Sequence, residues 1–261
     1  MSARTATFES SGASGGLRSR RAFLVKLLGG AAWVVHGGAL TRAAVAAARA
    51  LPDAVAGITI PATRVARAAA NLCAGASPDF LFNHCVRTFL FGALVARTHD
   101  TRYDAEIAFV AAALHDLGLI VKYSSRDEPF EIDGADAAKR FLNEQGFARE
   151  KTEVVWDAIA LHTSALSDRK GPEVALVSAG AGTDVFGGRL HLLAPDAVSA
   201  VLAQFPRLHF NDGFERLLLD YCQRKPLAQT GTWTDELCRS HVHGVRFPSI
   251  EQGLKASPFH E

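Results

Sequence analysis

Apolar residues recur at intervals of three and four along almost the whole chain after Pro61. Because an α-helix turns once in about 3.6 residues, this spacing places the apolar side chains on one helix face. Glycine and proline clusters separate the segments, and the only strand-like piece is 57–60. The spacing therefore predicts an all-α fold. The predicted helices cover 62–74, 78–97, 104–116, 134–145, 150–163, 172–187, 195–203, 212–223 and 233–240.

The first fifty residues have the composition of an export signal. Residues 1–18 are rich in serine and glycine and lack an apolar period, so we expect them to be disordered. The arginine pair at 20–21, followed by Phe-Leu, resembles the twin-arginine export signal of bacteria. The apolar stretch 27–35 is too short for a membrane span of about 20 residues. Small residues behind it offer signal-peptide cleavage sites after Ala46 or Ala48.

We therefore expect the twin-arginine export machinery to be a partner of this chain, and the mature protein to be periplasmic or secreted. We expect no stable membrane insertion. The alternative is a basic, amphipathic N-terminal helix that stays attached to the protein. The mature chain would start near Arg49 and, at about 210 residues, falls within the size range of one domain.

The charge balance and the cysteines exclude some classes of function. With 28 basic and 27 acidic residues the net charge is +1, which gives no reason to expect a nucleic-acid partner. No Cys-x-x-Cys pair suggests a zinc knuckle or a redox site. Cys222 and Cys238 can pair in an oxidising compartment. The simpler interpretation is that all four cysteines are free and buried.

Three stretches place metal-ligand residue types where the helical pattern predicts core. They contain His84, the pair His115-Asp116, and Asp184. A buried histidine or aspartate is costly unless it is paired or bound to a metal. Two imidazoles and two carboxylates form a donor set that suits zinc, iron(II) or manganese. Adjacent helical residues point about 100° apart, so the pair reaches one ion only beside a helix end, and Gly118 is consistent with that end.

The order His, His-Asp, Asp on separate predicted helices resembles the HD-domain metal-dependent hydrolase superfamily. The resemblance identifies His84, His115, Asp116 and Asp184 as ligands of a divalent metal, most simply zinc, with iron or manganese as alternatives. It extends further, because several stretches look like the cyanamide hydratase branch. These stretches are 83–92, 114–118, 130–135 and 159–163.

The resemblance implies a single HD-domain helical bundle of about 7–9 helices after a cleavable N-terminal signal. The expected organisation has four parts. They are the leader 1–48, a lead-in helix in 49–75, the HD metal-binding domain 76–190 and a C-terminal helical extension 191–261. A homo-oligomer is compatible with this organisation.

Two other residues near the ligands, His162 and Arg87, have several interpretations each. His162 is compatible with a second-metal ligand or a general acid/base, and equally with a helix-terminal histidine that contacts backbone carbonyls. Arg87 lies three residues after His84 and can hold a ligand carboxylate, meet an anionic substrate, or form a surface salt bridge. We expect Glu131 to line the pocket, Asp133 to cap the helix that follows it, and Lys122 to be solvated.

The implied activity is metal-dependent hydration or hydrolysis of a small polar molecule. Water activated by the metal would add to a nitrile-type carbon, giving urea from cyanamide, with Asp116 or His162 handling the proton. The first alternative is a phosphohydrolase of nucleotides or phosphate esters, which needs several Lys or Arg around the metal. Near the ligands only Arg87 qualifies. The second alternative is a non-catalytic metal-binding or sensor protein.

Overall fold

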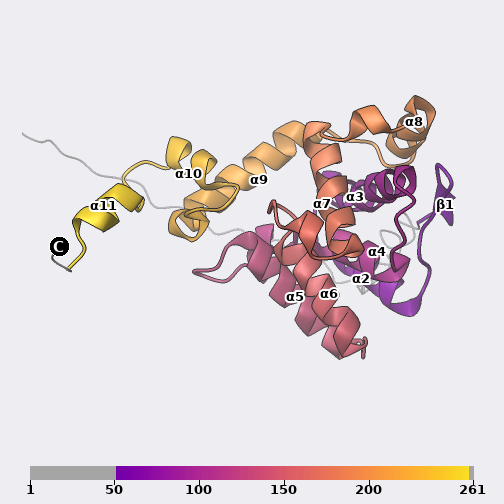
Figure 1. Cartoon of the computed structure of the whole chain (residues 1–261), viewed down its shortest axis with the longest axis horizontal. Coiled ribbons are helices and arrows are strands. Elements are labelled where there is room, and N and C mark those ends of the chain that lie inside the picture. Colours follow the sequence, from indigo (N-terminus) through magenta and orange to yellow (C-terminus); the bar gives the residue numbers. More distant parts are fainter. Residues whose placement is uncertain (1–50, 259–261) are drawn as a thin grey trace, which may run out of the picture. The chain divides into compact units, whose positions relative to one another are not determined.

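The computed structural model describes residues 51–258 of the chain. The predicted leader, its arginine pair and its cleavage sites lie outside these residues. The described part is all-α apart from one small hairpin, as predicted, and Figure 1 shows its helices. It contains ten α-helices, one more than the upper expected number. Within it, no helix has the length and hydrophobicity needed to cross a membrane.

The helices agree with the predicted segments to within a few residues at most boundaries. Helix α11 lies in the predicted C-terminal helical extension, beyond the last segment that the spacing located. The α-helices are α2 (Arg64–Ala76), α3 (Asp79–Thr98), α4 (Ala105–Leu114), α5 (Phe130–Glu144), α6 (Arg149–Ala160), α7 (Pro172–Phe186), α8 (Pro195–Gln204), α9 (Phe210–Arg224), α10 (Asp235–His241) and α11 (Ile250–Lys255). The 3-10 helices are η1 (Leu117–Leu119), η2 (Val121–Tyr123), η3 (Ser167–Arg169), η4 (Leu190–Leu192) and η5 (Pro226–Gln229).

The lead-in segment begins as a β-hairpin and not as a helix. Strands β1 (Ala54–Val55) and β2 (Ile58–Thr59) pair antiparallel. The two residues between them, Ala56 and Gly57, both have positive φ, at 50° and 75°. That combination is the backbone of the tight turn that matches the twist of two paired strands. Strand β2 lies within the predicted strand-like piece 57–60, and the helix predicted over 62–74 begins at Arg64 as α2.

Helix α4 lies at the centre of the main core. Every residue from Ile107 to Leu114 is buried, so this helix has no solvent face. Helices α3 and α7 lie side by side (Figure 1). They approach closely at Gly180, where an added Cβ atom would overlap the carbonyl oxygen of Thr88. This contact between backbones fixes the distance between two helices that carry predicted site residues.

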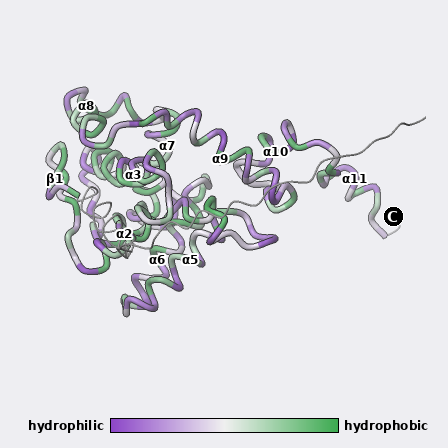
Figure 2. Tube along the Cα trace, turned by 180° about the vertical axis from the view of Figure 1, so that it is seen from behind, coloured by the Kyte–Doolittle hydropathy of each residue, from purple (hydrophilic) through white to green (hydrophobic). Residues whose placement is uncertain are grey.

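Helix α6 has the single buried face that its spacing predicts. Thr152, Val155 and Ile159 are buried at intervals of three and four, with Ala158 buried beside Ile159, and Figure 2 shows both hydrophilic and hydrophobic residues along this helix. Its apolar face packs against α5 and α4. Burial of that one face, and not helix propensity alone, therefore holds α6 in place.

Helix α5 begins four residues earlier than predicted, at Phe130. Pro129 occupies its N-cap position, and its fixed φ suits the start of a helix. The prediction that Asp133 is a cap is wrong, because this residue lies inside the helix and is buried. Its Oδ2 atom instead lies 2.6 Å from Nζ of the buried Lys225. This ion pair fastens the C-terminal extension to α5.

The C-terminal extension packs on a second, smaller core. This core joins the start of α3, η1, the start of α5 and α9. Its buried members are Leu81, Leu119, Phe130, Phe210, Phe214, Leu218 and Tyr221. A disulfide between Cys222 and Cys238 then links α9 to α10. The interpretation that all four cysteines are free is wrong for this pair, whereas Cys73 and Cys85 are free and buried.

Candidate metal centre

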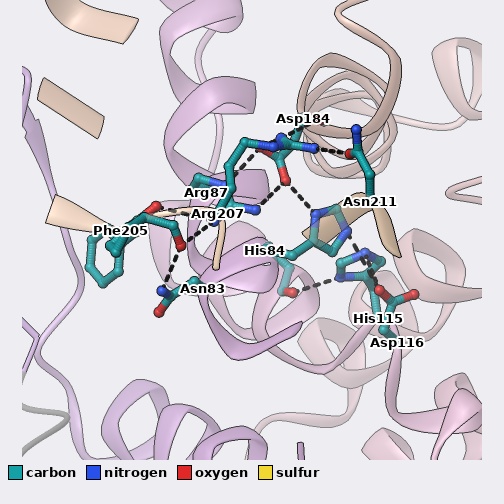
Figure 3. Close-up of polar contacts among 11 residues, drawn as sticks. Asn83, His84, Arg87, His115, Asp116, Asp184, Phe205, Arg207 and Asn211 are labelled. Carbon is teal, nitrogen blue, oxygen red and sulfur yellow. Dashed lines mark hydrogen bonds and ion pairs between the residues drawn. The ribbon is translucent and has the colours of Figure 1, made fainter. Parts of the chain in front are cut away.

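Three predicted ligands converge in the structure. His84 comes from α3, while His115 and Asp116 follow directly after α4. Each offers a donor atom, all three atoms lie within 4.8 Å of one another, and all three residues are buried. Figure 3 shows the two imidazoles and the Asp116 carboxylate facing one another. A group of this kind can hold a divalent metal ion.

The end of α4 allows two adjacent residues to face the same point. His115 keeps a helical backbone, but Asp116 departs from it, with φ −99° and ψ 9°, and η1 follows. Gly118 lets the start of α5 close over this turn, because an added Cβ atom there would overlap the carbonyl oxygen of Phe130. The expectation that the pair stands beside a helix end is confirmed.

Hydrogen bonds leave the same nitrogen free on both imidazoles. His115 Nδ1 lies 2.8 Å from the carbonyl oxygen of Ala112, and a carbonyl only accepts, so Nδ1 carries the proton. His84 Nδ1 lies 2.7 Å from Oδ2 of Asp184 in the same way. The Nε2 atom of each ring is therefore the lone-pair donor that faces the Asp116 carboxylate. Outer hydrogen bonds of this type orient metal-binding histidines.

Among these residues, Asp116 would be stabilised most by a bound cation. Its Oδ2 atom lies 3.5 Å from Nε2 of His84 and 3.4 Å from Nε2 of His115. Yet this buried oxygen accepts no hydrogen bond from the described residues. Burial raises the pKa of Asp116, which measures the cost of a buried charge. A divalent ion between these three donors would offset that cost, so the residues present fit a metal.

The fourth predicted ligand, Asp184, does not lie with the Nε2 atoms of the two histidines and has other neighbours. Its carboxylate lies on the Nδ1 side of the His84 ring, whereas Asp116 lies on the Nε2 side (Figure 3). Arg87 donates to it through Nε at 2.7 Å and Nη2 at 2.8 Å. Arg207 adds a third contact from Nη1 at 3.0 Å. The four predicted ligands are therefore brought together only in part, and Asp184 reaches the group of three through His84.

The neighbouring hydrogen-bond donors determine the protonation state of Asp184. Burial alone would raise its pKa, but the hydrogen bonds from His84 and Arg87 hold that pKa below its usual range. The carboxylate is therefore ionised, and it fixes the tautomer of His84. Arg87 is fully buried, so the prediction that it holds a carboxylate agrees with the geometry, and the surface salt bridge does not. Its Nη1 also donates to the Phe205 and Pro206 carbonyls.

His162 is the helix-terminal histidine that one interpretation predicts, and it also lies beside the group of three. It follows the end of α6, and its Nδ1 donates to the carbonyl oxygen of Ile159 at 2.6 Å. Its ring lies edge-on to that of His115, with 4.8 Å between the centroids. Burial and the neighbouring His115 lower the pKa of His162 to about 4. Its Nε2 is therefore a free proton acceptor at neutral pH, beside the group of three.

A cavity of about 230 Å³ opens next to these residues. His84, His115, Asp116 and His162 line one part of it. The other lining residues are Phe130, Thr163, Ser178, Ala181, Gly182, Val185, Phe186, Arg189, Phe214 and Trp233. Two predictions fall outside the cavity. Glu131 is buried and accepts a hydrogen bond from Thr163 but is not among the lining residues, and Lys122 is exposed, as expected.

Three contributors were not predicted from the sequence. Arg207 reaches Asp184 from a turn in which Leu208 and His209 adopt positive φ, at 51° and 58°. Phe210 stacks on the His84 ring with 4.8 Å between centroids. Trp233 lines the cavity from the C-terminal extension. Only an unusual backbone turn marks Arg207, and neither periodicity nor a motif signals such a turn.

Acidification is expected to destabilise the protein in a metal chelator. Burial lowers the pKa of His115 to about 3 and that of His162 to about 4, whereas the unfolded chain takes up these protons near pH 6.5. Because the unfolded state then binds more protons, the free energy of unfolding falls as pH drops from about 6.5 towards 4. Each imidazole contributes up to about 1.4 kcal/mol per pH unit.

Urea denaturation at several pH values measures this effect. A His162→Asn variant keeps a donor for the Ile159 carbonyl but cannot titrate. The difference in slope between the wild type and this variant isolates one imidazole from the carboxylates. Equal slopes over this pH range would contradict the prediction.

Comparison with known proteins places this geometry in a family context. Residues 81–181 match the model of the HD domain. Two curated proteins of Saccharomyces cerevisiae are similar to the chain, cyanamide hydratase DDI2 and cyanamide hydratase DDI3. Each is 26% identical over 167 residues, which cover 62% of this chain and 74% of the relative. Both findings agree with the resemblance deduced from the sequence.

Proposed function

The chain is an HD-domain protein similar to the cyanamide hydratase-like branch of that superfamily, and on this basis we propose that it adds water to a small nitrile-type molecule. The observation that carries the proposal is the buried Asp116 oxygen, which accepts no hydrogen bond from the described residues and faces two free imidazole nitrogens beside a cavity. Zinc is the proposed ion, with iron and manganese as alternatives, because nitrogen and oxygen donors suit all three.

A bound divalent ion would supply Lewis acidity and would lower the pKa of water. The residues of the chain supply the remaining functions. His84, His115 and Asp116 would hold the ion, and Asp184 keeps the His84 ring in the tautomer that leaves Nε2 free. Burial of all three donors excludes bulk water from that end of the cavity.

His162 is the proposed acid/base group. As a C–O bond forms between water and the nitrile carbon, Nε2 of His162 takes a proton from the water oxygen. The same atom then returns a proton to the nitrile nitrogen, and the resulting imidic acid rearranges to an amide, which is urea when the substrate is cyanamide. Its hydrogen bond to Ile159 holds the ring in place during both transfers.

The cations near the site favour this reaction over phosphate-ester hydrolysis. A phosphohydrolase needs several cations aimed at phosphate oxygens. Arg87 is fully buried and donates to Asp184 and to two backbone carbonyls, and it does not line the cavity. Among the described residues that line the cavity, Arg189 is the one Lys or Arg.

The direct test is urea formation from cyanamide by zinc-loaded protein, beside a phosphate ester such as p-nitrophenyl phosphate. Urea production that a chelator stops and zinc restores is the expected result. Hydrolysis of the phosphate ester without any nitrile hydration would overturn the proposal in favour of the phosphohydrolase. Metal binding with no turnover of either compound would favour a binding or sensor role.

The His162→Asn variant is expected to lower kcat for cyanamide by about 10²–10⁴-fold, the usual contribution of a general acid/base. Its zinc content should match that of the wild type, because His162 lies outside the group of three donors. Steady-state kinetics and elemental analysis measure the two quantities on the same preparation. A parallel loss of zinc would instead make His162 a ligand.

We also propose that the protein is exported through the twin-arginine pathway, on the arginine pair at 20–21 and the small residues behind the apolar stretch. Replacement of both arginines by lysine should leave the full-length precursor in the cytoplasm of a bacterial host. Fractionation and N-terminal sequencing check the location and the cleavage site. Export of the lysine variant at the wild-type level would contradict this proposal.

A further inference from the structure

The cavity beside the metal centre is larger than cyanamide requires. Cyanamide has three non-hydrogen atoms, and the cavity measures about 230 Å³. A water molecule takes up about 30 Å³ in the liquid, and pockets for drug-sized ligands begin near 300 Å³. The space therefore suits a molecule between these two sizes, with several atoms beyond the reacting group.

One wall of the cavity is aromatic. Phe214 and Phe130 lie beside the rings of His84 and His162, with 5.7 and 5.6 Å between centroids, and Phe186 and Trp233 complete the wall with the aliphatic Val185. Phe186 and Trp233 meet edge to face, with 5.9 Å between ring centroids. They are also partly open to solvent, Phe186 at 69% and Trp233 at 39% of their surfaces. Two exposed aromatic rings at one cavity edge form an apolar surface that a ligand can cover.

These rings also border a second cavity. Val185, Phe186, Phe214 and Trp233 line both the first cavity and a neighbouring one of about 430 Å³. The aromatic pair therefore stands where the two spaces meet. A flat apolar group that extends from the metal centre would contact both rings before it reached the second space.

Charge at the cavity favours an uncharged ligand. Asp116 is the one carboxylate and Arg189 the one Lys or Arg among its described lining residues. The Arg189 Nη2 atom lies 3.4 Å from Oδ2 of Asp168, an exposed contact outside the first cavity. Neither Asp116 nor Arg189 offers the paired, buried donors with which proteins hold an anionic group.

We propose that the substrates are uncharged nitrile-type molecules that carry an apolar, preferably aromatic, substituent, and that Phe186, Phe214 and Trp233 form the subsite for that substituent. This inference rests on the proposed hydration activity and narrows its substrate class. The reaction is the same addition of water to the nitrile carbon. The substituent takes no part in bond making and lies against the aromatic wall.

Kinetics on a matched substrate pair test the subsite. The probes are cyanamide and N-phenylcyanamide, which share the reacting group and differ by one phenyl ring. We expect kcat/KM to be at least tenfold higher for N-phenylcyanamide. In Trp233→Ala and Phe186→Ala variants the ratio of the two values should fall towards one. The control variant Trp156→Phe changes a tryptophan that does not line the cavity, and its ratio should remain that of the wild type.

Binding of the product gives a second readout that does not depend on turnover. Phenylurea should quench tryptophan fluorescence in the wild type and in Trp156→Phe, but not in Trp233→Phe, with or without zinc. Urea should not quench at the same concentration.

The outcomes separate the two proposals. Hydration of cyanamide with no preference for the phenyl compound, and no quenching at Trp233, would overturn the subsite and leave the hydratase function standing. No hydration of either compound by zinc-loaded protein, with phenylurea still bound at Trp233, would support the subsite and overturn the hydratase function.

Discussion

Replacing Asp116 by alanine is expected to abolish metal binding and, with it, activity. The wild type should contain about one equivalent of a divalent metal, and the variant close to none. The variant keeps the two imidazoles but loses the carboxylate, whose buried Oδ2 atom accepts no hydrogen bond from the described residues. Elemental analysis after dialysis gives the metal content, and urea formation should fall to the background rate.

Thermal unfolding adds a sharper criterion. Zinc at 1,000 times its dissociation constant stabilises a protein by about 4 kcal/mol, which corresponds to roughly 10 °C for a domain of this size. The wild type should show this rise in Tm, and Asp116→Ala should not. Without metal, however, the variant should be at least as stable as the wild type, because burial raises the pKa of Asp116 and so disfavours its charge.

A buried carboxylate outside the cluster provides the control. Glu131 is also buried, burial also raises its pKa, and it does not belong to the group of three. Glu131→Gln should retain both the metal and the rise in Tm. If Asp116→Ala kept its metal while Glu131→Gln lost it, the site would have to be reassigned.

Replacing Arg87 by methionine is expected to cost about 3–5 kcal/mol in the free energy of unfolding, the range for breaking a buried ion pair from one side. Arg87 and the Asp184 carboxylate are both fully buried, and the contact uses two nitrogens. The change removes two hydrogen bonds to a charge, and it leaves two backbone carbonyls with one donor fewer. Urea denaturation should show a lower midpoint with an unchanged slope.

Further variants separate charge from shape. Arg87→Lys should recover only part of the loss, because an ammonium group cannot match the planar fork of a guanidinium. Arg87→Met combined with Asp184→Leu removes both charges and should be less destabilised than Arg87→Met alone. Arg140→Met on the exposed face of α5 should change stability by less than about 0.5 kcal/mol. A loss of similar size at Arg87 would mean that the buried pair contributes nothing.

The sequence was most informative where one regular element decides the structure. The helical spacing located nine of the ten described α-helices, and the His115-Asp116 pair at a helix end indicated the centre of the site. These features depend on local periodicity and on the rarity of ligand-type residues in a core. Both are visible in a single sequence.

The errors arose where tertiary contacts override local signals. Asp133 has the residue type of a helix cap, but a distant lysine pairs with it inside α5. Asp184 has the residue type of a ligand, and two arginines from α3 and from the turn before α9 hold it on the Nδ1 side of His84, so its role as a fourth ligand stays a prediction. No spacing rule predicts which ring nitrogen of His84 each carboxylate will meet, because Asp184 lies 100 residues along the chain from His84.

The backbone contacts at Gly180 and Gly118 have a consequence for how this protein can change during evolution. A side chain at either glycine would overlap a neighbouring backbone carbonyl, so we expect substitutions there to move the helices that carry the candidate metal ligands. Phe186 and Trp233 are partly open to solvent, so we expect substitutions there to disturb the packing much less. Substitutions at these exposed rings would change which substrates fit the cavity and would leave the metal centre in place. We therefore expect paralogues with this architecture to differ in substrate while they share one type of reaction.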